Sequence, residues 1–148
     1  MLKPPDDTLR SLLDAAVAAE SEYTWTVDNG VVNVVPGYDE PRFLETIIPK
    51  LEINEAETTF DALGKLMALP EVSKQATLEL GIQTFGGSIG GYPNSSRTKI
   101  SLSLSNVTVR EALNAIARAR GNGVWLLVNQ ECPTPTGRKF YSLQFMDL

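Results

Sequence analysis

The sequence predicts an α+β fold in which a mixed or antiparallel sheet of about six strands carries two or three helices on one face. Two observations lead to this prediction. Short runs with alternating apolar residues, typical of strands that bury one face, are interleaved with segments that have the apolar period of amphipathic helices. The same strand–helix–strand order recurs, so we expect repeated units around one shared core.

Three segments predict amphipathic helices. The first spans residues 8–19, the second opens at Thr58, and the third opens at Thr108 and stops at Gly121. Thr108 and Glu111 have the spacing of a capping box, which satisfies two unpaired backbone donors. The expected core-facing residues are Leu9, Leu12, Leu13, Ala16 and Val17, then Phe60, Leu63, Leu66 and Met67, then Val109, Ala112, Leu113, Ile116 and Ala117.

Strands are predicted where apolar residues alternate with polar ones or cluster as β-branched runs. Asn29-Gly30 separates the first two strands, and its tolerance for positive φ predicts a tight hairpin turn. Residues 38–48 show little pattern, and residues 72–76 indicate a further helical turn. The predicted strands are 23–27, 31–35, a strand around 51–53, 78–82, 100–104, 124–128 and 140–145.

A repeat at a constant offset of 100 residues is the most informative pattern. Thr8, Arg10, Leu13, Ala15, Ala19 and Trp25 match Thr108, Arg110, Leu113, Ala115, Ala119 and Trp125. A weaker third copy aligns residues 51–66 with residues 102–116. We interpret the pattern as a recurring structural unit of capped helix and strand. The length of 148 residues suits a single domain, with a helix-plus-hairpin extension at 7–36 and a core at 48–146.

One stretch resembles the short N-terminal domain shared by secretins and TonB-dependent receptors. The resemblance covers residues 51–128 and is carried by Leu51-Glu52-Ile53, by Phe60-Asp61-Ala62-Leu63-Gly64-Lys65-Leu66 and by the run from Ile100 to Ile116. It implies two strand–helix–strand halves, a periplasmic or envelope-associated location in bacteria, protein partners and no catalytic residue. The chain departs from that family in its N-terminal extension, in the long segment 86–96 and in the absence of a following barrel.

The composition argues against several function classes. The chain has 13 basic and 18 acidic residues with no basic cluster, which disfavours nucleic acid as a partner. No apolar run approaches the roughly 20 residues of a membrane span. Histidine is absent and Cys132 is the single cysteine, so an intrachain disulfide is excluded and the commonest general base is missing. No signal peptide is visible, which leaves either a leader upstream of Met1 or a cytoplasmic protein.

Each candidate chemical site has a simpler explanation. The glycine-rich segment 86–96 lacks the Lys-Ser/Thr of a phosphate-binding loop, and Cys132 has no histidine to activate it. The pairs Glu55/Glu57 and Asp39/Glu40 have the features of solvated surface charges rather than an acid–base dyad. Trp25 and Trp125 favour core positions over ligand stacking. Arg110, Arg118 and Arg120 are candidates for an acidic partner, although Arg118 and Arg120 also complement a helix dipole.

The sequence therefore predicts a non-enzymatic protein- or peptide-binding or assembly module, with no catalytic, cofactor-binding or metal-binding residues. Self-association stays open. The candidate partner or ligand contacts are Gly86, Gly87, Gly90, Gly91, Tyr92, Arg118 and Arg120. The alternatives are a small-molecule-binding domain with a pocket near residues 86–96, and a hydrolase that uses Ser, Asp or Lys.

Overall fold

A computed structural model describes residues 8–37, 40–79, 99–121, 123–131 and 139–147 of the chain. The chain divides into two compact units, Met1–Glu40 (unit 1) and Pro41–Leu148 (unit 2). The helix and hairpin predicted at 7–36 fall in unit 1, and the core predicted at 48–146 falls in unit 2.

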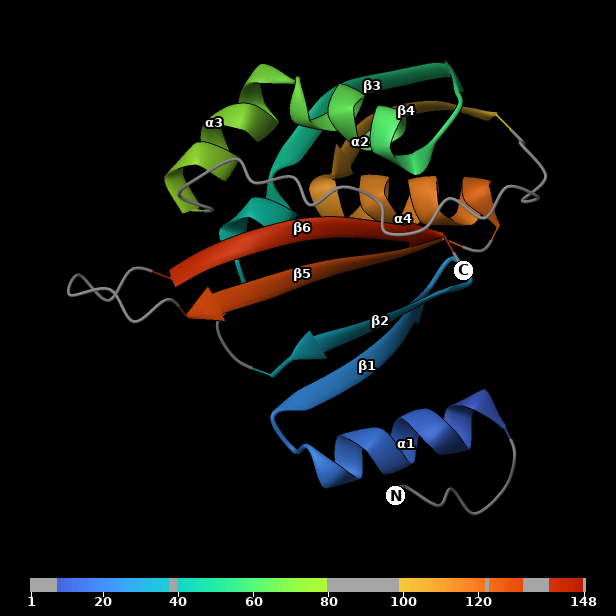
Figure 1. Cartoon of the computed structure of the whole chain (residues 1–148), viewed down its shortest axis with the longest axis vertical. Helices are drawn as coiled ribbons and strands as arrows, with labels where there is room; N and C mark the ends of the chain where they lie inside the picture. The colour runs from blue at the N-terminus through green and yellow to red at the C-terminus, as the bar shows by residue number, and fades with distance from the viewer. Residues whose placement is uncertain (1–7, 38–39, 80–98, 122, 132–138, 148) are drawn as a thin grey trace. The chain divides into compact units, whose positions relative to one another are not determined.

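Unit 1 consists of one helix and one hairpin (Figure 1). Helix α1 (Leu9–Ala19) begins after Thr8, whose hydroxyl accepts a hydrogen bond from the Ser11 amide at 3.2 Å. Strands β1 (Tyr23–Asp28) and β2 (Val31–Pro36) pair antiparallel. Asn29 and Gly30 between them have φ of 48° and 83°, which confirms the predicted tight turn.

The first hairpin of unit 2 pairs two strands that are distant in sequence. Strands β3 (Ile47–Ala56) and β4 (Ile100–Thr108) are antiparallel, and each leads directly into a helix. Helices α2 (Thr59–Met67) and α4 (Val109–Arg120) both begin with a complete capping box, formed by Thr58 with Asp61 and by Thr108 with Glu111. The capping box predicted at Thr108 is therefore confirmed, and so is Gly121 as the end of α4, where it has φ of 89°.

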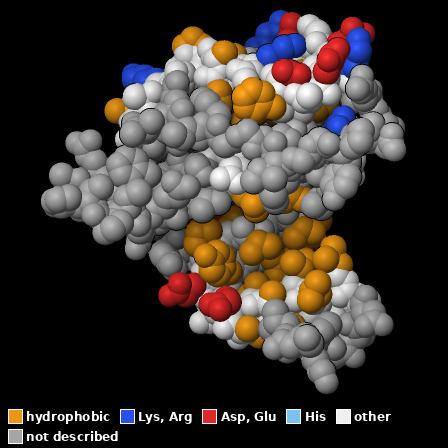
Figure 2. Space-filling view, viewed as in Figure 1, with side chains coloured by type: hydrophobic (Ala, Val, Ile, Leu, Met, Phe, Trp, Pro, Cys, Tyr) orange, Lys and Arg blue, Asp and Glu red, His pale blue; other side chains and the backbone are white. Residues whose placement is uncertain are grey.

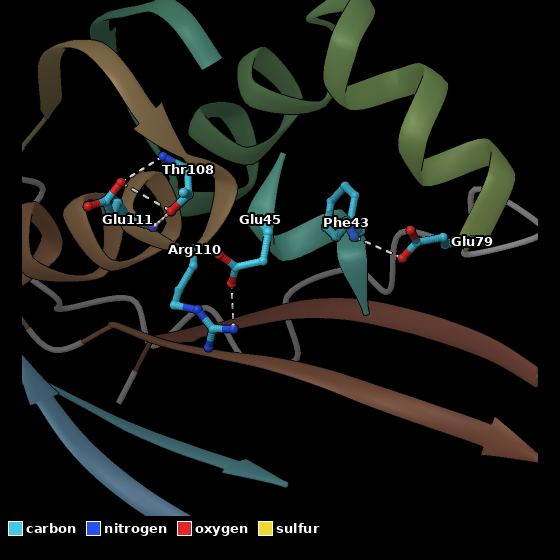
Figure 3. Close-up of polar contacts among 6 residues, drawn as sticks. All are labelled: Phe43, Glu45, Glu79, Thr108, Arg110 and Glu111. Carbon is cyan, nitrogen blue, oxygen red and sulfur yellow. Dashed lines mark hydrogen bonds and ion pairs between the residues drawn. The ribbon is translucent and has the colours of Figure 1, made fainter. Parts of the chain in front are cut away.

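Residues 38–48, which have little sequence pattern, contain a short 3-10 helix, η1 (Arg42–Glu45), with buried Phe43 and Leu44. Two helices hold η1 by hydrogen bonds (Figure 3). Glu79, at the end of α3 (Pro70–Glu79), accepts a hydrogen bond from the Phe43 amide at 2.8 Å. Arg110 on α4 forms an ion pair with Glu45 at 3.1 Å. These contacts are long-range, so local periodicity does not reveal η1.

The core of unit 2 surrounds α4. This helix lies between the β3–β4 hairpin and a further hairpin of β5 (Gly123–Glu131) and β6 (Lys139–Asp147) (Figure 1). It contacts β4, β5, α2 and η1. The largest fully buried side chains are Phe43, Ile48, Leu51, Ile53, Leu63, Leu66, Val72, Ile100, Val109, Leu113, Ile116 and Leu143.

The strands do not form the single six-stranded sheet that the sequence predicts. In the described part of the chain, six strands form three separate two-stranded antiparallel hairpins, and there are four α-helices rather than two or three. Alternating apolar residues indicate that one face of a strand is covered. The same pattern arises in a two-stranded hairpin that packs against a helix and in a wide sheet, so it does not reveal the number of strands in a sheet. The strand predicted at 78–82 is also wrong in its described part, because Leu78 belongs to α3 and is exposed.

A tryptophan hydrogen bond occurs at the same spacing in both units. Trp25 Nε1 donates to Asp14 Oδ1 at 3.0 Å, and Trp125 Nε1 donates to Asn114 Oδ1 at 2.9 Å. Each bond joins the helix to the strand that follows it, and the pairs are related by the offset of 100 residues. The environments differ, because Asn114 is buried and Asp14 is exposed.

We expect these two bonds to contribute unequally to stability. Asn114→Ala leaves a partly buried indole N–H without its acceptor and should lower the free energy of unfolding by about 1–3 kcal/mol. Asp14→Ala removes the same kind of bond where water replaces the acceptor, and should cost about 1 kcal/mol or less. Urea unfolding followed by circular dichroism compares them, and equal losses would contradict the difference in burial.

Candidate protein-interaction surface

The predicted contact residues are only partly within the described structure. Residues 86–96, which include Gly86, Gly87, Gly90, Gly91 and Tyr92, lie outside the described residues, as does Cys132. Arg118 and Arg120 lie in the last turn of α4, the position where cations complement the helix dipole. Both residues already have an interaction partner. Arg118 and Arg120 are thus the two predicted contact residues that the structure describes.

The described residues contain no group of three or more histidine, cysteine, aspartate or glutamate side chains placed to hold a metal ion. Of the two predicted carboxylate pairs, Glu55 forms an exposed ion pair with Lys99 at 3.1 Å, and Asp39 lies outside the described residues. Within the same described ranges, none of the helices is both long and apolar enough to cross a lipid bilayer.

A shallow groove of about 510 Å³ lies between the end of β3 and α2. Three of its four charged side chains are already engaged with the protein. Lys65 Nζ donates to the Asn54 carbonyl at 3.1 Å, Asp61 completes the capping box with Thr58, and Glu55 pairs with Lys99. Phe60, predicted to face the core, instead lies exposed in this groove. The groove therefore offers one aromatic side chain and no convergent set of uncommitted polar groups.

Five of the nine large hydrophobic side chains that are exposed in the described part of the chain belong to unit 1. We call these residues the unit 1 apolar surface, with their exposed fractions: Leu9 61%, Leu12 45%, Tyr23 46%, Val27 55% and Val34 52%. Figure 2 shows hydrophobic side chains gathered over β1 and β2. Leu9 and Leu12 were predicted to face the core, and the structure corrects this, because both side chains are exposed and no described segment of unit 1 covers them.

The strand members of this surface share one face of the hairpin. Side chains alternate along a strand, so Tyr23 and Val27 point to the same side as Trp25. Val34 lies directly opposite Trp25 in the antiparallel register and completes that face. Trp25 bonds to Asp14 of α1, and the Arg10 guanidinium lies 5.2 Å from the centre of its ring. The apolar strand face and α1 are therefore linked through Trp25.

The equivalent positions in unit 2 are buried. Leu9 corresponds to Val109 and Leu12 to Ala112 at the offset of 100, and both α4 residues are fully buried. In the strand register, Val34 faces Trp25 as Phe145 faces Trp125, and Phe145 is only 4% exposed. Both units share the threonine cap, the tryptophan hydrogen bond and the strand register, so we attribute the difference in burial to the other segments that pack against α4 and β6 in unit 2.

Helix α2 is a large part of that cover in unit 2. It contacts both α4 and β6, and its Leu63, Leu66 and Met67 belong to the same core cluster as Phe145. Trp125 packs against this cluster and is half-buried, as expected for a core aromatic. No described segment of unit 1 corresponds to α2. The sequence could not show this, because both helices carry the same apolar spacing.

Comparison with protein-family models, with curated proteins and with solved structures gives no match for this chain. The similarity of residues 51–128 to the short N-terminal domain of secretins and TonB-dependent receptors therefore stays an expectation from the sequence.

Equivalent substitutions in the two helices test the difference in burial. Leu9→Ala should change the free energy of unfolding by no more than about 0.5 kcal/mol, as for other surface positions. Val109→Ala removes buried methyl groups and should cost about 1–3 kcal/mol. Chemical denaturation of the two variants decides the matter, and a Leu9→Ala loss as large as that of Val109→Ala would mean that α1 is covered.

Proposed function

We propose that the chain is a non-enzymatic protein- or peptide-binding module whose contact surface is the unit 1 apolar surface. The observation that carries the proposal is the exposure of Val27 and Val34 beside Trp25. At the equivalent positions of unit 2, Leu127 is half-buried and Phe145 is buried. Exposed apolar patches of this kind are typical of protein-interaction sites.

The size of the surface favours a transient complex. Full burial of a valine or leucine side chain stabilises by about 1.5–3 kcal/mol, so covering the exposed half of five such side chains offers about 4–8 kcal/mol. Association costs a similar amount in lost motion. The apolar contact therefore has to be supplemented by polar contacts around it to give a specific complex.

The proposal includes two further inferences about the origin and setting of the module. We infer that α1–β1–β2 and α4–β5–β6 are copies of one unit, which is supported by their shared threonine caps and tryptophan bonds. We place the protein in the bacterial cell envelope, supported by the resemblance of residues 51–128 described above. In this view unit 2 is the copy with its own helical cover, and unit 1 is the copy that uses a partner.

The double substitution Val27→Thr/Val34→Thr tests the proposal. It keeps side-chain shape and strand propensity but makes the surface polar, so binding to a partner should weaken at least tenfold. The partner is captured from a lysate of the source organism with the full chain, identified by mass spectrometry, purified, and titrated by calorimetry.

Ser103→Thr, on the exposed face of β4, is the matched control and should leave binding unchanged. Circular dichroism establishes that each variant is folded. A purified partner that binds the double variant and the unchanged chain with equal affinity would place the contact elsewhere and refute the proposed surface.

A further inference from the structure

The negative charge of the chain is concentrated in unit 1. Residues 1–40 contain two basic and eight acidic residues, whereas residues 41–148 contain eleven basic and ten acidic residues. The net charge of -5 for the whole chain therefore comes entirely from the first 40 residues. The same segment carries the unit 1 apolar surface.

Carboxylates are the main charged groups in the described part of unit 1. In the described part of unit 1, Arg10 is the one basic residue, and its guanidinium lies over the Trp25 ring. Figure 2 shows acidic side chains beside the hydrophobic group over β1 and β2. The acidic residues of this part of the chain are Asp14, Glu20, Glu22, Asp28 and Glu40.

In unit 2, helix α2 covers part of the surface that corresponds to the unit 1 apolar surface, so it indicates which kind of element packs there. Helix α2 lies against both α4 and β6, and it presents Leu63, Leu66 and Met67 at helical spacing to the core. A nine-residue helix with one apolar face thus supplies a large part of the cover for a helix and hairpin in unit 2, together with β4 and η1. An external helix with an apolar face is the corresponding occupant for unit 1.

The negative charge of unit 1 favours some partners for the unit 1 apolar surface over others. Charges within about 10 Å interact appreciably at 0.1 M salt, so a second copy of unit 1 or an anionic lipid surface would be repelled. Lysine and arginine residues beside the apolar face of a helix would be attracted and would supply the polar contacts that the apolar area lacks.

We propose that the unit 1 apolar surface binds a basic amphipathic helix of another protein. This inference rests on the proposed function and adds the chemistry of the partner. The apolar face of the helix covers Val27, Val34 and the exposed side of α1, and its basic residues face the carboxylates of unit 1.

Two matched peptides test the proposal on the full chain. The first is an 18-residue fluorescein-labelled amphipathic helix with leucines at positions i, i+3, i+4 and i+7 and lysines on the polar face, and the second has glutamate in place of every lysine. In fluorescence anisotropy at 50 mM salt, the lysine peptide should bind at least tenfold more tightly than the glutamate peptide. Its affinity should fall as the salt concentration rises.

Chain variants locate the contact. Val27→Thr/Val34→Thr should weaken lysine-peptide binding at least tenfold. Glu20→Lys should weaken it at least threefold. Glu52→Lys makes the same change of charge at an exposed site in unit 2 and should alter it by less than twofold. Circular dichroism verifies that each variant is folded.

Three results would overturn the inference. Equal binding of both peptides, with both weakened by Val27→Thr/Val34→Thr, would leave the apolar surface as a binding site but remove the selection for a basic partner. If the lysine peptide does not bind, the partner is not a basic amphipathic helix. The proposed function is then tested separately by the capture of a partner from the lysate. Self-association or binding to phosphatidylglycerol vesicles that Val27→Thr/Val34→Thr abolishes would assign the surface to a second copy or to lipid.

Discussion

The burial of α4 is the constraint on which the rest of unit 2 depends. Its apolar face places Leu113 and Ile116 in a core that also contains residues of β3, α2, η1 and β6. Because those elements come from segments separated by up to about 100 positions, no local interaction could bring them together. The ion pair of Arg110 with Glu45 and the hydrogen bond of Glu79 to the Phe43 amide then fix η1 at one side of this core. The two capping boxes determine where the helices that close it begin.

The sequence allowed prediction of the features that depend on neighbouring residues. The Asn29-Gly30 turn, the capping box of Thr108 with Glu111 and the stop at Gly121 follow from backbone conformations or hydrogen bonds within a few positions, and the structure confirms each of them. The arrangement of strands could not be predicted in this way. Pairing of Leu51 with Leu104 joins residues far apart in the chain, and alternation reveals only that each strand has a covered face.

The exposed unit 1 apolar surface was not predicted from the sequence, for a related reason. Leu9 and Leu12 have the same helical spacing as the buried residues of α4, so periodicity predicts that both helices are covered. Only the structure shows that α2 packs over the helix and hairpin of unit 2 and that no described segment of unit 1 has the corresponding place over α1. The signal available in the sequence was the uneven distribution of charge, since eight of the 18 acidic residues lie in the first 40 positions.

The acceptors of the two tryptophan bonds carry a consequence for how unit 1 meets other molecules. Asn114 has a neutral amide side chain, which can be buried without a large penalty as long as its hydrogen-bonding groups have partners. Asp14 occupies the same place with a full negative charge, and enclosing it without a counter-charge would be far more costly than leaving it in water. A molecule that binds over this part of α1 must therefore place a cation beside the Asp14 carboxylate or leave the carboxylate accessible to water. A purely apolar binding face would leave this charge buried without a partner.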